Sequence, residues 1–193
     1  MKKMIILVIL AVATVSTFAQ KFGVKAGVNL SSYYGDDAKG SKTLTGFQVG
    51  GLYEMPLSEG FFLQPELLLT LKGAKSAVGD LKMKPFYLQV PVKAMYKLDL
   101  GTGKFTLAAG PYAAIGIAGK VSSGSESANL FTKEDGATEA MLKRFDLGLS
   151  SGIGYEFNSG LFINFESSLG FLNVAKDSKM KNSTLSLVAG FKF

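Results

Sequence analysis

The feature that most constrains this chain is an alternation of apolar and polar residues with period two. It recurs in eight segments, and the apolar phase of these segments contains no charged residue apart from Lys143 at the start of one of them. Successive side chains of a β-strand point to opposite faces, so each segment predicts a strand with one wholly apolar face. In segment 86–98 this phase reads Phe86, Leu88, Val90, Val92, Ala94, Tyr96 and Leu98.

The spacing of these segments predicts a closed sheet. We expect strands at 21–34, 44–55, 61–72, 85–98, 104–120, 143–157, 161–173 and 183–193. Every second connection is short: 56–60, 99–103 and 158–160. The others are longer and polar, and 121–142 is the longest. Short turns at one end and long loops at the other are typical of a transmembrane β-barrel of the outer membrane, with its turns in the periplasm. An even number of strands places both termini on the periplasmic side.

Aromatic residues of the apolar phase fall at the strand ends, as they do at the two interfaces of a membrane. The predicted turn end has Phe22, Tyr53, Phe61, Tyr96, Phe105, Tyr155, Phe157, Phe191 and Phe193, and the loop end has Tyr34, Phe47, Phe86, Phe145 and Phe171. Ten residues separate the two belts, which at ~3.3 Å per residue and a tilt of about 40° gives roughly 25 Å along the membrane normal. A soluble core would not confine its aromatics in this way.

The opposite face is rich in Gly, Ser and Ala and has few Lys or Glu residues. Small side chains suit a narrow lumen, because an eight-stranded barrel is only just wide enough for its side chains to fill. We therefore predict an all-β fold: a single eight-stranded antiparallel up-and-down transmembrane β-barrel with short periplasmic turns and longer extracellular loops. Pro65, Pro91 and Pro111 lie within predicted strands and predict bulges or local breaks in the ladder.

The amino terminus has the layout of a secretory signal peptide. Lys2 and Lys3 precede an apolar run, and Thr17 and Ala19 are small residues suited to cleavage after Ala19. We expect a signal peptide at 1–19 and a barrel domain at 20–193, with the mature chain in the outer membrane. Removal of the signal peptide, with Lys2 and Lys3, lowers the formal charge from +6 to +4.

The chain has no His and no Cys. The commonest general base, the thiolate nucleophile and most transition-metal ligands are therefore missing. We expect no enzymatic activity, no catalytic residues, no metal and no cofactor. Binding of nucleic acid is not expected of an exported chain without a basic stripe.

Four charged residues of the polar phase are predicted to share one layer inside the lumen: Lys25, Glu66, Lys93 and Glu166. Each lies four or five residues from the turn end. Buried charges need partners, so we expect Glu66 to pair with Lys93 and the layer to plug the barrel. The alternative is a charged constriction in a narrow channel for small solutes.

A second charged group is predicted near the loop mouth: Lys72, Lys120, Arg144 and Asp146. A solvated rim is one interpretation. Contact with anionic lipid, including the phosphates of lipopolysaccharide, is the other.

Several motifs resemble the small outer-membrane β-barrel domain family often described as porin-family or PorT-like. They are Leu63-Gln64-Pro65-Glu66, Phe86-Tyr87-Leu88-Gln89-Val90-Pro91, Ala109-Gly110-Pro111-Tyr112, Phe145-Asp146-Leu147-Gly148 and Ser151-Gly152-Ile153-Gly154-Tyr155. The resemblance covers essentially the whole mature chain. It implies a Gram-negative outer-membrane barrel and offers no catalytic residues to transfer.

The same resemblance suggests partners. Phe191-Lys192-Phe193 resembles the alternating aromatic ending that the barrel-assembly machinery reads, through the C-terminal Phe193. We expect a monomer among outer-membrane lipids with a structural or interaction role through its surface loops. A narrow diffusion pore and an accessory barrel of a protein secretion system are the alternatives.

Overall fold

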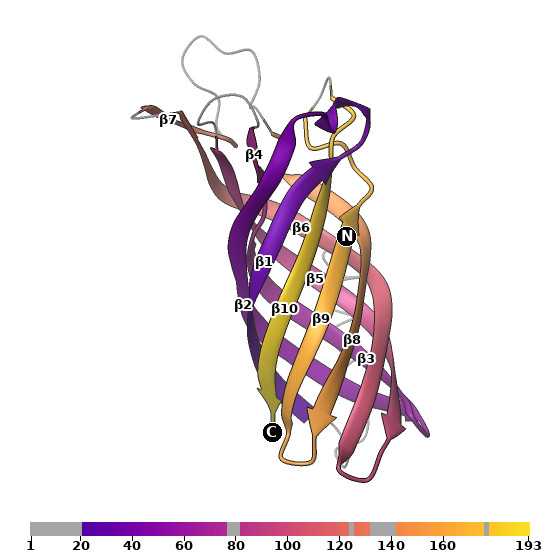
Figure 1. Ribbon diagram of the computed structural model, residues 1–193. Coiled ribbons are helices and arrows are strands. Elements are labelled where there is room, and N and C mark those ends of the chain that lie inside the picture. Colours follow the sequence, from indigo (N-terminus) through magenta and orange to yellow (C-terminus); the bar gives the residue numbers. More distant parts are fainter. Residues whose placement is uncertain (1–20, 77–81, 124–125, 132–141, 176–177) are drawn as a thin grey trace, which may run out of the picture.

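A computed structural model describes residues 21–76, 82–123, 126–131, 142–175 and 178–193. Eight long strands form a closed antiparallel barrel (Figure 1). They are β1 (Lys21–Tyr34), β2 (Ser41–Ser58), β3 (Phe61–Leu71), β5 (Lys82–Asp99), β6 (Gly103–Ser123), β8 (Phe145–Phe157), β9 (Leu161–Gly170) and β10 (Lys181–Lys192). Each pairs with the next long strand, and β1 pairs with both β2 and β10, which closes the ring. The predicted fold class is confirmed.

The loop end contains three further short elements: the 3-10 helix η1 (Asp36–Ala38), β4 (Ala74–Ser76) and β7 (Glu126–Asn129). β4 bridges β2 and β5, and β7 forms a hairpin with the end of β6. The long strands β2, β5 and β6 therefore extend further toward the loops than their hydrophobic alternation predicted. The reason is that backbone pairing continues beyond the apolar band through β4 and β7, where side chains no longer need to alternate.

The three short connections lie together at the opposite end, which we call the turn end (Figure 1). Each contains a glycine at positive φ: Gly60 at 74°, Gly101 at 83° and Gly160 at 91°. L-residues rarely adopt this conformation, so these glycines allow the tight reversals. The carboxyl terminus also lies at the turn end. No helix in the described part of the chain is long and apolar enough to span a membrane.

Pro65, Pro91 and Pro111 interrupt hydrogen bonding without shifting the register. The ladder between β3 and β5 breaks after Pro65 and resumes at Leu68 in the same register, opposite a segment that includes Pro91. Between β5 and β6 the ladder breaks after the pair of Pro91 and Tyr112 and again resumes unchanged. Breaks therefore occur as predicted, whereas the shifts of register lie elsewhere, at Pro56/Ser58 and Phe86/Tyr87.

The two faces of the barrel differ as the alternation predicts. Residues of the apolar phase are exposed on the outside, among them Val28, Leu149 and Leu187. Aromatic side chains of different strands contact each other within the predicted belts. Ring centroids are 4.7 Å apart for Phe22 and Tyr53 and 4.8 Å apart for Phe61 and Tyr96 at the turn end, and 6.0 Å apart for Phe47 and Phe86 nearer the loops. The predicted signal peptide, 1–19, lies outside the described residues.

Candidate functional site

Four charged side chains meet in the middle of the barrel interior. Lys25 Nζ lies 2.6 Å from Glu66 Oε2 and 2.8 Å from Glu166 Oε1. Lys93 Nζ lies 3.0 Å from Glu66 Oε1 and 3.1 Å from Glu166 Oε1. Each lysine therefore contacts both glutamates, and the four form a closed square that we call the middle layer. All four candidates expected to share a layer are brought together here, including the pair of Glu66 and Lys93.

The middle layer is supplied by four strands that are distant in sequence: β1, β3, β5 and β9. Inward positions repeat every second residue, so closure of the barrel points these side chains at one another. Two amides complete the layer: Gln48 Nε2 donates to Glu166 at 3.3 Å and Gln64 Nε2 donates to Glu66 at 2.7 Å. The charged side chains are at most 6% exposed, so their pairing compensates charges that are removed from water.

A second square lies toward the turn end, and we call it the lower layer. Lys97 Nζ lies 2.6 Å from Glu54 and 2.7 Å from Glu156. Lys192 Nζ makes the same two contacts, also at 2.6 and 2.7 Å. The lower layer thus repeats the topology of the middle one, with two cations each held by two carboxylates.

Sequence reasoning missed the lower layer. All four residues belong to the inward phase of their strands, and Lys97 follows Lys93 by four residues, so the signal was present. Their positions near the strand ends do not show how deep into the barrel their side chains reach. The expectation that the inner face carries few Lys or Glu residues was wrong for the same reason, because the interior buries two full sets of them.

The predicted loop-mouth cluster divides between the inside and the outside. Lys72 and Asp146 are each only 2% exposed and face each other inside the barrel, with Lys72 Nζ 3.6 Å from Asp146 Oδ2. The prediction of a solvated rim is wrong for these two residues, because the apolar loop residues above them exclude solvent. Lys120 and Arg144 are exposed.

The environment of Lys72 is aromatic rather than ionic. Its Nζ lies 4.4 Å from the ring centroid of Tyr112 and 5.5 Å from that of Tyr87. Asp146 Oδ2 accepts hydrogen bonds from Tyr112 at 2.9 Å and from Asn182 at 3.0 Å. Among the described residues, Lys72 Nζ, Asp146 Oδ1 and Tyr33 Oη are buried without a hydrogen-bond partner. We call this group the upper site.

An apolar cluster packs against the upper site at the loop end, and we call it the cap. Its buried members come from strands and from loop flanks: Tyr33, Ala74, Tyr87, Tyr112, Ala114, Leu130, Phe131, Leu142 and Val174. The Phe131 ring contacts Tyr87 edge to face at 5.8 Å. A Cβ at Gly116 would come within 2.3 Å of the same ring, so Phe131 depends on a glycine opposite it.

Arg144 connects the loop segment that contains Phe131 to β6 by hydrogen bonds. Its Nη2 donates to the Phe131 carbonyl at 2.8 Å and its Nη1 donates to the Gly116 carbonyl at 3.2 Å. The long connection predicted as a polar loop over 121–142 is thus ordered at both described flanks, which turn apolar side chains inward. The described residues contain no cluster of three or more acidic, histidine or cysteine side chains suited to a metal ion.

A closed ring of eight strands with an apolar exterior and a charged, paired interior defines a transmembrane β-barrel. The sequence matches the model of the outer membrane protein beta-barrel domain family over residues 5–193, and the chain belongs to this family. It is a protein of the outer membrane, so the apolar exterior faces lipid. Comparison with curated protein sequences gives no match.

Solved structures support the fold. Neisserial surface protein A is similar with a TM-score of 0.54 and 15% identity, over 89% of this chain and 97% of that one. The attachment invasion locus protein Ail of Yersinia pestis is similar with a TM-score of 0.50 and 17% identity, over 91% of this chain and 100% of that one. At these identities the likeness concerns the fold alone.

Proposed function

We propose that this protein is a closed outer-membrane barrel with a structural or interaction role, exerted through the surface formed by its loops. The observation that carries the proposal is the pairing of opposite charges in successive layers of the interior. Each of the middle and lower layers contains two Lys and two Glu, so neither has a net charge.

Ion selectivity in a pore comes from rings of charge of one sign or from carbonyl oxygens that replace an ion's water. Mixed squares of side chains at 2.6 to 3.1 Å offer neither, since every charge is already bound to a neighbour. An eight-stranded barrel is also about the size that side chains can fill. The interior therefore favours a plug over the narrow diffusion pore that is its main rival.

The loop end supports the same proposal. Leu130, Phe131 and Leu142 are each at most 6% exposed and belong to the cap, which covers the upper site. A solute entering from the loops would have to displace these apolar side chains before it reached the charged layers. Closure is thus achieved twice, by packing at the mouth and by ion pairs below it.

The remaining features of the proposal concern placement and partners. We propose that residues 1–19 are a signal peptide, that both termini are periplasmic and that the loops face outward, in keeping with short turns and longer loops. The barrel acts as a monomer, is recognised by the assembly machinery through Phe193, and presents Lys120 and Arg144 to anionic lipid such as lipopolysaccharide. No catalysis, metal or cofactor is involved. A role as an accessory barrel in secretion would use the same loop surface.

The loop role is tested by capture of partners from outer-membrane extracts, with the intact barrel and with a variant that lacks residues 132–141. A variant with Lys97→Met, Lys192→Met, Glu54→Gln and Glu156→Gln serves as the matched control, because it removes the cations and anions of the lower layer together and leaves the loops intact. We expect partners that bind the intact barrel and the interior variant but not the deletion. Identical capture by all three would contradict an interaction role for this loop.

A further inference from the structure

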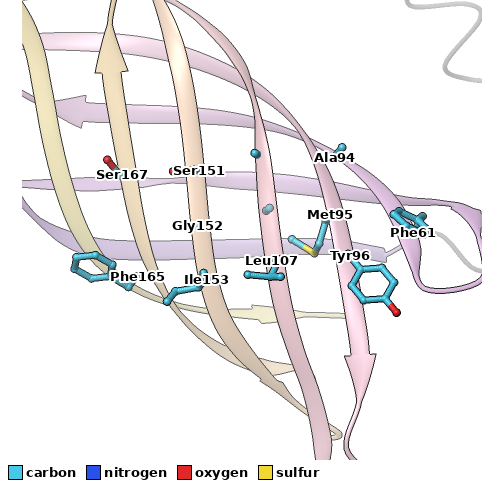
Figure 2. Close-up of a pocket in the computed structure, with 12 residues that line it drawn as sticks. Phe61, Ala94, Met95, Tyr96, Leu107, Ser151, Gly152, Ile153, Phe165 and Ser167 are labelled. Atoms are coloured by element: carbon cyan, nitrogen blue, oxygen red, sulfur yellow. The ribbon is translucent and has the colours of Figure 1, made fainter.

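The lipid-facing side of the barrel has a groove of about 530 Å³ across β5, β6, β8 and β9 (Figure 2). Its floor is one row of small outward residues that pair directly from strand to strand. Ala94 lies opposite Ala109, Ala109 opposite Ser151, and Ser151 opposite Ser167. The groove follows from the register of the barrel, which sets four small side chains side by side.

The turn-side wall of the groove is the next outward row, which consists of large side chains. Tyr96 lies opposite Leu107, Leu107 opposite Ile153, and Ile153 opposite Phe165. Figure 2 shows these four in a line beside the floor residues Ala94, Ser151 and Ser167. They are 39 to 50% exposed, so they stand out from the sheet and give the groove its depth.

We propose that this groove binds one acyl chain of a phospholipid from the leaflet at the turn end. The groove is continuous with the lipid-facing surface that family membership establishes, and it lies directly beside the aromatic belt residues Phe61 and Tyr96. The choice of a phospholipid rather than lipopolysaccharide rests on the orientation proposed above, which makes the turn end periplasmic. The groove itself does not depend on a closed lumen.

The dimensions favour a hydrocarbon chain over a protein partner. Four neighbouring strands span about 14 Å at ~4.8 Å per strand, and one row of outward residues is roughly 7 Å wide. An α-helix with its side chains is about 10 to 12 Å across and needs roughly 30 Å to cross the bilayer. A second copy of the barrel would present large side chains of its own aromatic belt, which do not fit a groove only one row of residues wide. A slim, flexible chain fits both the width and the length.

Ser151 and Ser167 in the floor give a second reason to expect an acyl chain in the groove. Both point into the groove (Figure 2), and within the described residues neither makes a side-chain hydrogen bond. Other outward residues of β8 and β9 are large and apolar, such as Leu149 and Leu169. Two small residues in their place keep the floor low, at the cost of polar atoms in the hydrocarbon region.

A tryptophan reporter tests the proposal, because the natural chain has none. Phe165→Trp places the reporter in the groove wall, and Val28→Trp places one on β1, two strands away from β9, where Val28 is 55% exposed. Both full-length variants are titrated in detergent micelles with phosphatidylethanolamine brominated on its acyl chains. Bromine quenches tryptophan on contact.

We expect half-maximal quenching of the F165W variant at a lipid fraction roughly three- to tenfold lower than for V28W, because a chain in the groove contacts both its floor and its wall. Adding Ala109→Leu and Ser151→Leu, which fill the groove, should move the F165W curve onto that of V28W. Ala26→Leu, an outward substitution on β1, should leave it unchanged. Heat-modifiable migration on gels verifies that each variant has folded.

Two results would overturn the proposal. Coinciding curves for F165W and V28W would show that lipid does not prefer the groove. Protection of F165W from quenching, with relief on dilution of the protein, would show that a second copy occupies it. Neither result bears on whether the lumen is closed, so the two proposals fail separately.

Discussion

The two halves of the barrel interior bury lysines in different ways. Toward the turns, four lysines each contact two carboxylates: Lys25, Lys93, Lys97 and Lys192. Toward the loops, Lys72 has one carboxylate oxygen at 3.6 Å and two tyrosine rings. The first arrangement satisfies every charge, whereas the second leaves three buried polar atoms unpaired among the described residues.

This difference indicates where the structure is most able to change. Breaking a closed square leaves a charge without its partner in a place that water does not reach, which is costly. The upper site is held by ring contacts and by the cap, whose members come partly from loop flanks. The turn half is thus the rigid part of the proposed plug, and the loop half is the part that a binding partner could rearrange.

The largest effects are expected from breaking either charged layer, and the middle layer is the first case. Glu66→Ala leaves Lys25 and Lys93 to share Glu166, so it should lower the free energy of unfolding in lipid by about 3 to 5 kcal/mol. Urea titration in phospholipid vesicles measures this. Adding Lys93→Met should recover at least half of the loss, since the pair of Lys25 and Glu166 then remains. A loss of less than about 1 kcal/mol in the single variant would contradict the account.

A comparable test concerns the outer face at the same height. Val92 is 37% exposed on β5 and faces lipid, so Val92→Arg should cost about 2 to 4 kcal/mol in the same titration. Val92→Leu, which keeps the position apolar, should change stability by less than about 1 kcal/mol. If the arginine variant folded as stably as wild type, the assignment of lipid to this face would fail.

The comparison between the halves is sharpened by removing one lysine from each. Lys97→Met leaves Glu54 paired with Lys192 alone, and Glu156 with Lys192 and the partly exposed Lys21 at 3.9 Å, and should cost about 3 to 5 kcal/mol. Lys72→Met should cost only about 1 to 2 kcal/mol, because Asp146 keeps its bonds from Tyr112 and Asn182 and the lost contact is mainly with aromatic rings. Equal losses would show that the two halves do not differ.

The smallest effect is expected outside the barrel. Lys179 and Asp36 form an ion pair at 3.3 Å between loops, with side chains 72% and 78% exposed. Lys179→Ala should change stability by no more than about 0.5 kcal/mol, because water and salt screen such a pair. A loss above 1 kcal/mol would mean that this loop contact supports the barrel itself.

Much of the fold could be predicted from the sequence because the physics of a membrane strand is local. Alternation assigns each residue to a face, and the aromatic belts fix the ends of the band. The same rule placed Glu66 and Lys93 on the inner face. It did not predict β4 and β7, since pairing above the membrane needs no hydrophobic pattern.

How deep inside the barrel a side chain lies is harder to predict than whether it points inward or outward. Lys97 and Glu156 lie near strand ends in sequence, yet long side chains reach inward to form the lower layer. Lys72 and Asp146 were expected to be solvated, but the cap that buries them includes Leu130 and Phe131 from a mostly polar connection. Which loop residues fold inward depends on packing between distant segments, and a single sequence carries no pattern for it.

Single-channel recording in planar bilayers tests the central claim of a closed lumen most directly. The account predicts that the purified wild-type barrel shows no defined, reproducible openings. A double variant with Glu66→Ala and Lys93→Ala, which removes one cation and one anion from the middle layer, is expected to stay closed as well, because the lower layer and the cap still block the lumen. Discrete openings of constant size in the wild-type protein would contradict the closed barrel and favour a diffusion pore.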